Sequence, residues 1–206
     1  MSSFTDVIKT RRSIRKFVKR PVEAEVVRAI VEAATWAPSA HNAQPWRFVV
    51  LVDPKCKRGL AAAMAETWLQ DLKRDGVPQA TRAAIARESV EQFASAPVLV
   101  VACLSLEDMD QYPDEERRRC ERDLAVHSLA AAIENMLLAA HARGLGSCWY
   151  CAPVFCQTAV RHALKIPGEV EPQALIAIGY PAENPRAPSR IPMGRVACLD
   201  EWGKPL

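Results

Sequence analysis

The sequence is poor in aromatic residues and nearly balanced in charge. Aromatic residues make up 6% of the 206 residues, and Lys and Arg outnumber Asp and Glu by only 27 to 24. A weak basic excess with few rings to stack on bases argues against a nucleic-acid partner. No stretch approaches the 18 apolar residues of a membrane helix, so we expect no membrane partner. The opening residues lack the apolar core of a signal peptide, and we interpret them as mature sequence.

Familiar catalytic and metal-binding signatures are also absent. The sequence has no Walker loop, no H-E-x-x-H and no G-x-S-x-G, which argues against the corresponding nucleotide, zinc and nucleophile sites. His127, His141 and His162 lie on expected helices without ligand spacing, so we expect no metal site. The seven cysteines include one C-x-x-C, at Cys148 and Cys151. A single copy of this motif is weak evidence for redox chemistry. We expect the cysteines to be reduced, and therefore the protein to be cytoplasmic.

The rest of the composition is that of one globular domain over residues 1–206. Half of the residues are hydrophobic and a quarter are charged, which suffices for a core at this length. Apolar residues at helical spacing predict six helices, at 4–10, 22–36, 60–72, 79–93, 122–143 and 154–164. Continuous apolar runs predict buried strands at 48–52, 98–104 and 174–178. The charge-dense stretch 110–122 is expected to be a solvated loop leading onto a helix face. Helices framing buried strands indicate an α+β layered fold.

Three polar clusters interrupt this apolar pattern. The first holds Arg11, Arg12, Ser13 and Arg15. Guanidinium groups bind phosphate oxygens in pairs, so this cluster suits a phosphate or a similar anion. The alternative is a solvated basic stretch, because further lysines and arginines follow it.

The second cluster is the segment 38–48, in which two prolines stiffen a loop. Asn42 and Gln44 can each donate and accept hydrogen bonds, so they could read the edge of a heteroaromatic ring. The alternative is a helix-to-strand connection whose polar groups satisfy one another. His41 is a candidate general acid or an ordinary surface residue. The third cluster is 144–150, whose glycines would let a ligand ring approach the backbone.

Together these segments resemble one known family. The resemblance is carried by RRSIRKF at 11–17, APS at 37–39, Asn42, QPWRF at 44–48, GLG at 144–146, GYP at 179–181 and the tail around Arg190. In this order they are similar to the nitroreductase family of FMN-dependent NAD(P)H oxidoreductases, over nearly the whole chain. The resemblance implies a three-layer fold with a central, mostly antiparallel sheet flanked by helices. It also implies an intertwined homodimer with FMN sites at the interface.

The resemblance further implies which residues hold the cofactor. They are Arg11, Arg12, Ser13 and Arg15; Pro38, Ser39, Asn42 and Gln44 from the other subunit; the backbone around Trp149, Cys151 and Ala152; and Arg190. His41 and Tyr150 are the candidates for proton donation, and no other side chain has an assigned catalytic role. Two departures from the family pattern are notable. No acidic residue lies at 150–152, and Pro188 stands where a second basic residue often precedes the tail arginine.

The expected function is hydride transfer from NAD(P)H, through FMN, to a nitroaromatic, a quinone or a similar small acceptor by a ping-pong mechanism. The segment 61–95, which shapes the substrate pocket in this family, matches nothing that identifies the acceptor. Alternatives are a specialised member that handles a deazaflavin coenzyme or modifies flavin, and a flavin carrier or sensor without turnover. A basic binding module without flavin is a further alternative.

Overall fold

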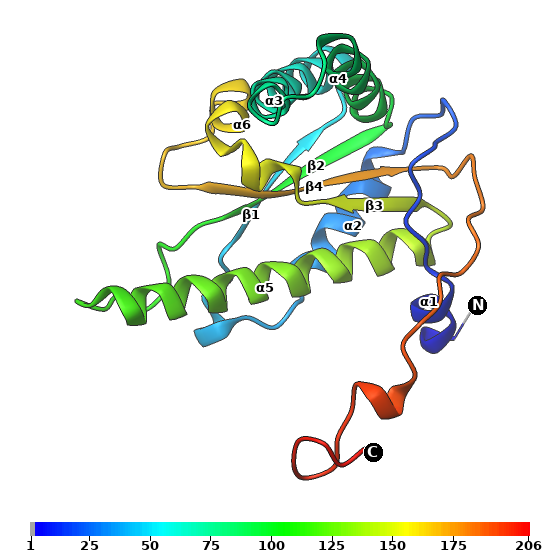
Figure 1. Cartoon of the computed structure of the whole chain (residues 1–206). Coiled ribbons are helices and arrows are strands. Elements are labelled where there is room, and N and C mark those ends of the chain that lie inside the picture. The colour runs from blue at the N-terminus through cyan, green and yellow to red at the C-terminus, as the bar shows by residue number, and fades with distance from the viewer. Residues whose placement is uncertain (1–2) are drawn as a thin grey trace.

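A computed structural model describes residues 3–206 and shows an α+β fold built on one sheet (Figure 1). Its strands are β1 (Trp46–Leu51), β2 (Val98–Leu104), β3 (Gly146–Tyr150) and β4 (Glu171–Gly179). They lie in the order β1-β2-β4-β3, and every neighbouring pair is antiparallel. The expected antiparallel sheet flanked by helices is therefore confirmed.

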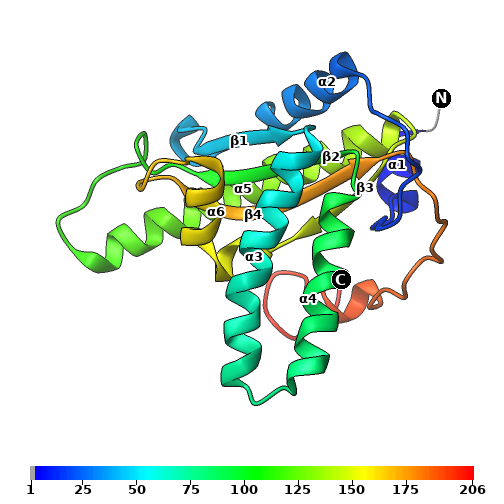
Figure 2. The same cartoon turned by 90° about the horizontal axis from the view of Figure 1, so that it is seen from above.

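Helices cover both faces of the sheet and complete three layers (Figures 1 and 2). One face carries α2 (Ala24–Thr35) and α5 (Glu115–Ala142), and the other carries α3 (Pro54–Arg74), α4 (Gln79–Ala94) and α6 (Gln157–Leu164). The short α1 (Phe4–Thr10) packs near the end of α5. Two 3-10 turns, η1 (Ala40–Asn42) and η2 (Ala152–Phe155), lie in connections, and a third, η3 (Met193–Arg195), lies in the C-terminal tail.

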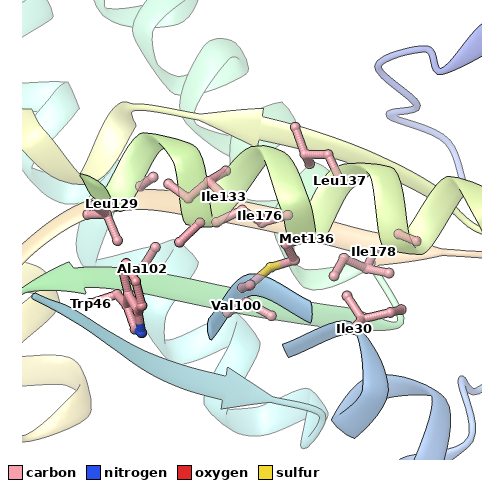
Figure 3. Packing of buried hydrophobic residues seen from close by; sticks show 14 of the residues in the cluster. Ile30, Trp46, Val100, Ala102, Leu129, Ile133, Met136, Leu137, Ile176 and Ile178 are labelled. Carbon is pink, nitrogen blue, oxygen red and sulfur yellow. The ribbon is translucent and has the colours of Figure 1, made fainter. Parts of the chain in front are cut away.

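Strand β2 is the centre of the core, because all seven of its residues are buried. Side chains alternate between the two faces of a strand. Val98, Val100 and Ala102 therefore pack against α2 and α5 (Figure 3), whereas Leu99 and Val101 pack against the layer of α3, α4 and α6. Burial on both faces explains why this strand reads as an unbroken apolar run rather than an alternating one.

Helix α5 begins earlier than the sequence indicated. We expected a loop over 110–122, but Asp114 caps the helix by accepting a hydrogen bond from the backbone N–H of Arg117, at 2.9 Å. The expectation was wrong because the first two turns are solvated and carry no apolar periodicity. By length and composition alone α5 is apolar enough to cross a membrane. The sequence expectation that no stretch approaches a membrane helix was therefore too strict. Its apolar residues, among them Leu129, Ile133 and Met136, instead pack against the sheet (Figure 3).

The hairpin of α3 and α4 projects past the sheet (Figure 2). Helix α3 starts six residues before the expected position 60, where Asp53 accepts a hydrogen bond from the backbone N–H of Cys56 and Pro54 opens the first turn. Lys57 in this turn is buried, and its Nζ donates to the carbonyls of Ala96 (2.6 Å) and Pro97 (2.9 Å). Burial lowers the pKa of Lys57. This contact fixes the base of the hairpin at the start of β2.

Candidate functional site

The arginine cluster lies on an arm that continues the sheet beyond β3. The backbone N–H of Ile14 donates to the carbonyl of Ser147 at 2.9 Å, and that of Val18 donates to the carbonyl of Tyr180 at 3.0 Å. Gly146 permits this close approach, because a Cβ there would lie 2.7 Å from the Cβ of Ile14. The arm therefore holds Arg11 to Arg15 beside the start of β3.

The residues of this cluster differ in whether their side chains already bond to other groups of the chain. The guanidinium of Arg11 lies 3.5 Å from a carboxylate oxygen of Glu134 on α5. Arg12 donates through Nη1 to the carbonyls of Lys9 (2.8 Å) and Arg11 (2.7 Å). The Arg15 side chain is exposed and makes no hydrogen bond or ion pair with residues 3–206. Ser13 is also exposed.

A carboxylate lies beside this cluster. Oε1 of Glu183 accepts hydrogen bonds from the backbone N–H groups of Arg15 (2.6 Å) and Lys16 (3.1 Å). Two backbone donors that an anion could use are therefore engaged by Glu183. An anion bound here depends on the guanidinium groups more than on the main chain.

The loop of the second cluster has a tightly set backbone. His41, Asn42 and Gln44 all have left-handed φ angles, of 54°, 54° and 47°. Two hydroxyls hold this shape: Ser39 Oγ accepts from the backbone N–H of Gln44, and Ser128 Oγ accepts from that of Ala40, each at 3.1 Å. The side chains of Asn42 and Gln44 are exposed, so they remain available to a ligand. Pro38 lies on the surface beside them.

Within one chain the two clusters lie at opposite edges of the sheet. The arm runs along β3, whereas the loop leads into β1. Both contact α5: Ala40 reaches Ser128, and Thr10 reaches His141. These two contacts are 13 residues apart, or about 20 Å along a helix. Figure 1 shows α1 beside the C-terminal end of α5, whereas the connection before β1 runs past the first half of that helix.

The end of β3 supplies the third group of predicted residues. Trp149 is partly buried, and its Nε1 is a buried donor without a partner among residues 3–206. The Tyr150 hydroxyl accepts a hydrogen bond from Nε2 of Gln92 at 2.9 Å, and its ring meets Phe93 edge to face at 5.1 Å. Burial raises the pKa of Tyr150, so the phenol stays protonated at neutral pH. Cys151 is an exposed free thiol, and Ala152 opens η2.

Tyr150 opens into a cavity of about 590 Å³ between α3, α4 and η2. The lining is mostly apolar and includes Met64, Trp68, Ile85, Phe93, Ala152 and Phe155. Besides Tyr150, its polar members are Thr67, Asp71, Glu88, Ser89 and Gln92. Gln92 donates to the Tyr150 oxygen, so this contact does not use the phenolic hydrogen, which a ligand in the cavity could accept. A flat apolar molecule with a hydrogen-bond acceptor suits such a lining.

Sequence reasoning found Tyr150 but missed its partners. Gln92, Phe93 and Trp68 lie on the α3–α4 hairpin, and nothing in its helical pattern marks them as pocket residues. Sequence reasoning also missed that His41 meets Asp110 and Glu121, because these residues are far apart along the chain. Arg190 lies on an exposed tail that extends away from the layered body (Figure 1). Within one chain, therefore, the arm lies against β3, and the loop before β1 stays apart from both.

Comparison with known proteins identifies the family of the chain. Residues 8–180 match the model of the nitroreductase family. The chain is 34% identical to a protein named NADH dehydrogenase from Thermus thermophilus, with 90% of each chain covered. A BluB-like flavoprotein from Clostridium difficile superposes with a TM-score of 0.81 at 27% identity, covering 98% of this chain and all of that one. A putative nitroreductase of Desulfovibrio desulfuricans in complex with FMN gives 0.73 at 29% identity, covering 98% and 99%. The chain thus belongs to the nitroreductase family, an enzyme family of NAD(P)H oxidoreductases.

Proposed function

We propose that this protein is an FMN-dependent oxidoreductase that takes hydride from NADH or NADPH and reduces a nitroaromatic, a quinone or a similar acceptor in ping-pong turns. The observation that carries the proposal is the meeting of three parts at β3. The arginine-bearing arm, the unpartnered indole N–H of Trp149 and the cavity beside Tyr150 all adjoin this one strand. A phosphate-bearing cofactor with a flat ring needs these elements side by side.

The residues present fit FMN. Arg15 offers a guanidinium without an internal partner among the described residues, as a phosphate ligand should. Trp149 Nε1 is a buried donor that a ring carbonyl could satisfy, and a buried donor without a partner costs about 1–3 kcal/mol. Arg11, Arg12 and Ser13 would flank the phosphate and ribityl chain, and Arg190 would close on it from the tail. When bound, FMN supplies the hydride chemistry, while the protein orients the reactants and excludes water.

We further propose that the site is shared by two chains in a homodimer. Pro38, Ser39, Asn42 and Gln44 would reach the cofactor from the partner, which accounts for their position at the far edge of the sheet from the arm. Exposed aromatic side chains support association. Phe4, Trp36, Phe155 and Trp202 are 73%, 81%, 82% and 97% exposed in the single chain, and such apolar exposure is typical of interfaces.

The cavity beside Tyr150 would hold the hydride donor and the acceptor in turn. Its apolar walls favour an aromatic acceptor, whereas Asp71 and Glu88 disfavour anionic ones. Tyr150 can donate a hydrogen bond or a proton to an acceptor oxygen, and His41 remains the second candidate for proton donation. We place the enzyme in the cytoplasm, where its seven free thiols would stay reduced.

The test is an absorbance spectrum of the purified protein between 300 and roughly 500 nm, before and after anaerobic addition of NADPH or NADH. We expect the bands of oxidised flavin, which bleach on reduction and return when a quinone is added. Flavin that does not bleach would overturn the proposed turnover and favour a carrier or a specialised member. A colourless protein that also takes up no added FMN would overturn the cofactor assignment.

A further inference from the structure

A second polar cluster lies away from the cavity beside Tyr150, where η1 meets the first half of α5. Nε2 of His41 is 3.4 Å from Oε1 of Glu121 and 3.9 Å from Oδ2 of Asp110. The three side chains come from η1, the loop after β2 and α5. One atom from each, a ring nitrogen or a carboxylate oxygen, lies within 4.8 Å of the other two.

Glu121 is the member that an ordinary surface ion pair does not explain. It is only 7% exposed, and its Oε2 is buried without a hydrogen-bond partner among residues 3–206. A buried carboxylate normally has a full set of partners, because removing its charge from water is costly. The basic residue found within 4 Å of Glu121, among residues 3–206, is His41. Its single Nε2 faces two carboxylates, those of Glu121 and Asp110.

The charges in the cluster require more than His41 can provide. Even a protonated imidazole carries one positive charge against two carboxylates. A divalent cation would neutralise both, and His41 could then bind it as a neutral ring through Nε2. For metal–ligand bonds of about 2.0–2.2 Å, neighbouring ligand atoms in a tetrahedral site lie about 3.3–3.6 Å apart. The His41–Glu121 separation of 3.4 Å has this value, whereas the half-exposed Asp110, at 3.9 Å from Nε2 of His41 and within 4.8 Å of the Glu121 oxygen, must turn toward the ion.

We propose that His41, Asp110 and Glu121 form a binding site for one divalent transition-metal ion, with Zn²⁺ the best fit. One imidazole and two carboxylates are suitable ligands for this ion, and three protein ligands leave a fourth position open. In the single chain a polar hollow of about 560 Å³, lined in part by His41 and Arg47, adjoins the cluster. This proposal differs from the sequence expectation that the chain binds no metal. With His41 on the ion, Tyr150 would be the remaining candidate proton donor.

Substitutions that each remove one proposed ligand atom or its charge allow a direct test. His41→Asn keeps a residue type that tolerates a positive φ, Glu121→Gln keeps the buried shape, and Asp110→Asn changes an exposed group. Asp108→Asn is the matched control: it lies in the same loop and is similarly exposed, but it faces Arg47 at 3.6 Å instead of the cluster. All variants keep the seven cysteines, so zinc bound by thiols is common to all of them. Circular dichroism and FMN content establish that each variant is folded.

The measurement is calorimetric titration of Zn²⁺ into the chelator-stripped, FMN-loaded protein. The wild type and Asp108→Asn should each bind one equivalent per chain that is lost, or weakened more than about tenfold, in His41→Asn and Glu121→Gln. Equal zinc uptake by all variants would place the ion on thiols or elsewhere and overturn the proposal. No uptake by the wild type would also overturn it, and the cluster would then be a histidine–carboxylate ion pair.

Discussion

At the scale of single residues, Arg15 differs from the arginines around it. Arg11 faces Glu134 and Arg12 is tied to backbone carbonyls, whereas the Arg15 guanidinium is free of such partners among the described residues. Arg15→Ala should therefore weaken FMN binding by about 10- to 100-fold, the cost of a lost charge-assisted hydrogen bond or pair. Fluorescence titration with FMN measures this change. Lys16→Ala, the next residue on the arm, is the control, and equal affinities in the two variants would remove Arg15 from the phosphate site.

His141 connects α1 to α5 and should make stability depend on pH. The Thr10 hydroxyl donates to the carbonyl of Asp6, so its oxygen accepts from Nε2 of His141 at 2.9 Å. Burial, followed by the charges of Arg11 and Arg12, lowers the pKa of His141 below its ordinary 6.5. The folded protein then prefers the neutral ring. This contribution to stability is complete above pH 6.5 and is lost as the pH falls through the lowered pKa.

Melting temperatures measured from pH 7.5 down to about 5 should show this loss. In His141→Gln the amide can still donate to Thr10 but does not titrate, so its melting temperature should fall less over the same range. His162→Gln, at an exposed position of α6, should behave like the wild type. A His141→Gln curve that runs parallel to the wild type would exclude His141 as the titrating group.

At the scale of elements, the docking of the arm on β3 depends on Gly146. A methyl group there would lie 2.7 Å from Cβ of Ile14, and both atoms belong to rigid parts of the chain. Gly146→Ala should cost about 1–3 kcal/mol in the free energy of unfolding, as overpacking does. It should also weaken FMN binding, because the arm carries Arg15. Gly59→Ala is the contrast: Gly59 lies within α3 with nothing within 4 Å, so alanine should stabilise by up to about 1 kcal/mol. Urea unfolding of both variants tests the pair, and an unaffected Gly146→Ala would mean that the arm docks differently.

The elements were predictable where apolar residues mark them and not elsewhere. Strand β2 was predicted at 98–104 and is found there, because burial on both faces leaves an unbroken apolar run. Helix ends were less predictable, since capping groups such as Asp53 and Asp114 act through side-chain hydrogen bonds rather than periodicity. The pairing of the arm with β3 has no local signal. It depends on the absence of a side chain at Gly146, 132 positions after Ile14.

The candidate site divides in the same way. Arg15 and Asn42 could be proposed from the sequence because their segments match family motifs, and Tyr150 because it ends the glycine-bearing segment 144–150. Gln92 and Glu121 were not, since each is one polar residue among many on a helix and becomes notable only by what it meets across the fold. Glu121 is distinguished by burial, and burial of a carboxylate on a charge-rich helical turn is a property of the packed molecule.

At the scale of the whole molecule, the arm and the loop before β1 lie at opposite edges of one sheet. If one cofactor contacts both groups, two chains must supply them, and the dimer and its FMN should be lost together. Phe4→Glu with Ile8→Glu places two charges on the exposed apolar side of α1, at side chains 73% and 50% exposed, so folding of the chain is spared. The variant should be monomeric by light scattering and should bind FMN more than about tenfold more weakly. Val52→Glu, 59% exposed just beyond β1, is the control and should stay dimeric and yellow.

Dilution of the wild-type protein tests independently whether FMN is released when the dimer dissociates. Flavin fluorescence rises when FMN leaves a protein, so release can be followed as the concentration falls and compared with the dimer fraction at each point. Mass action couples the two when the cofactor binds only the assembled pair. The curves should coincide, and added FMN should shift both to lower protein concentration. A monomer that keeps its FMN through dilution would show that one chain forms the whole site, and Asn42 and Gln44 would then need another role at the far edge of the sheet.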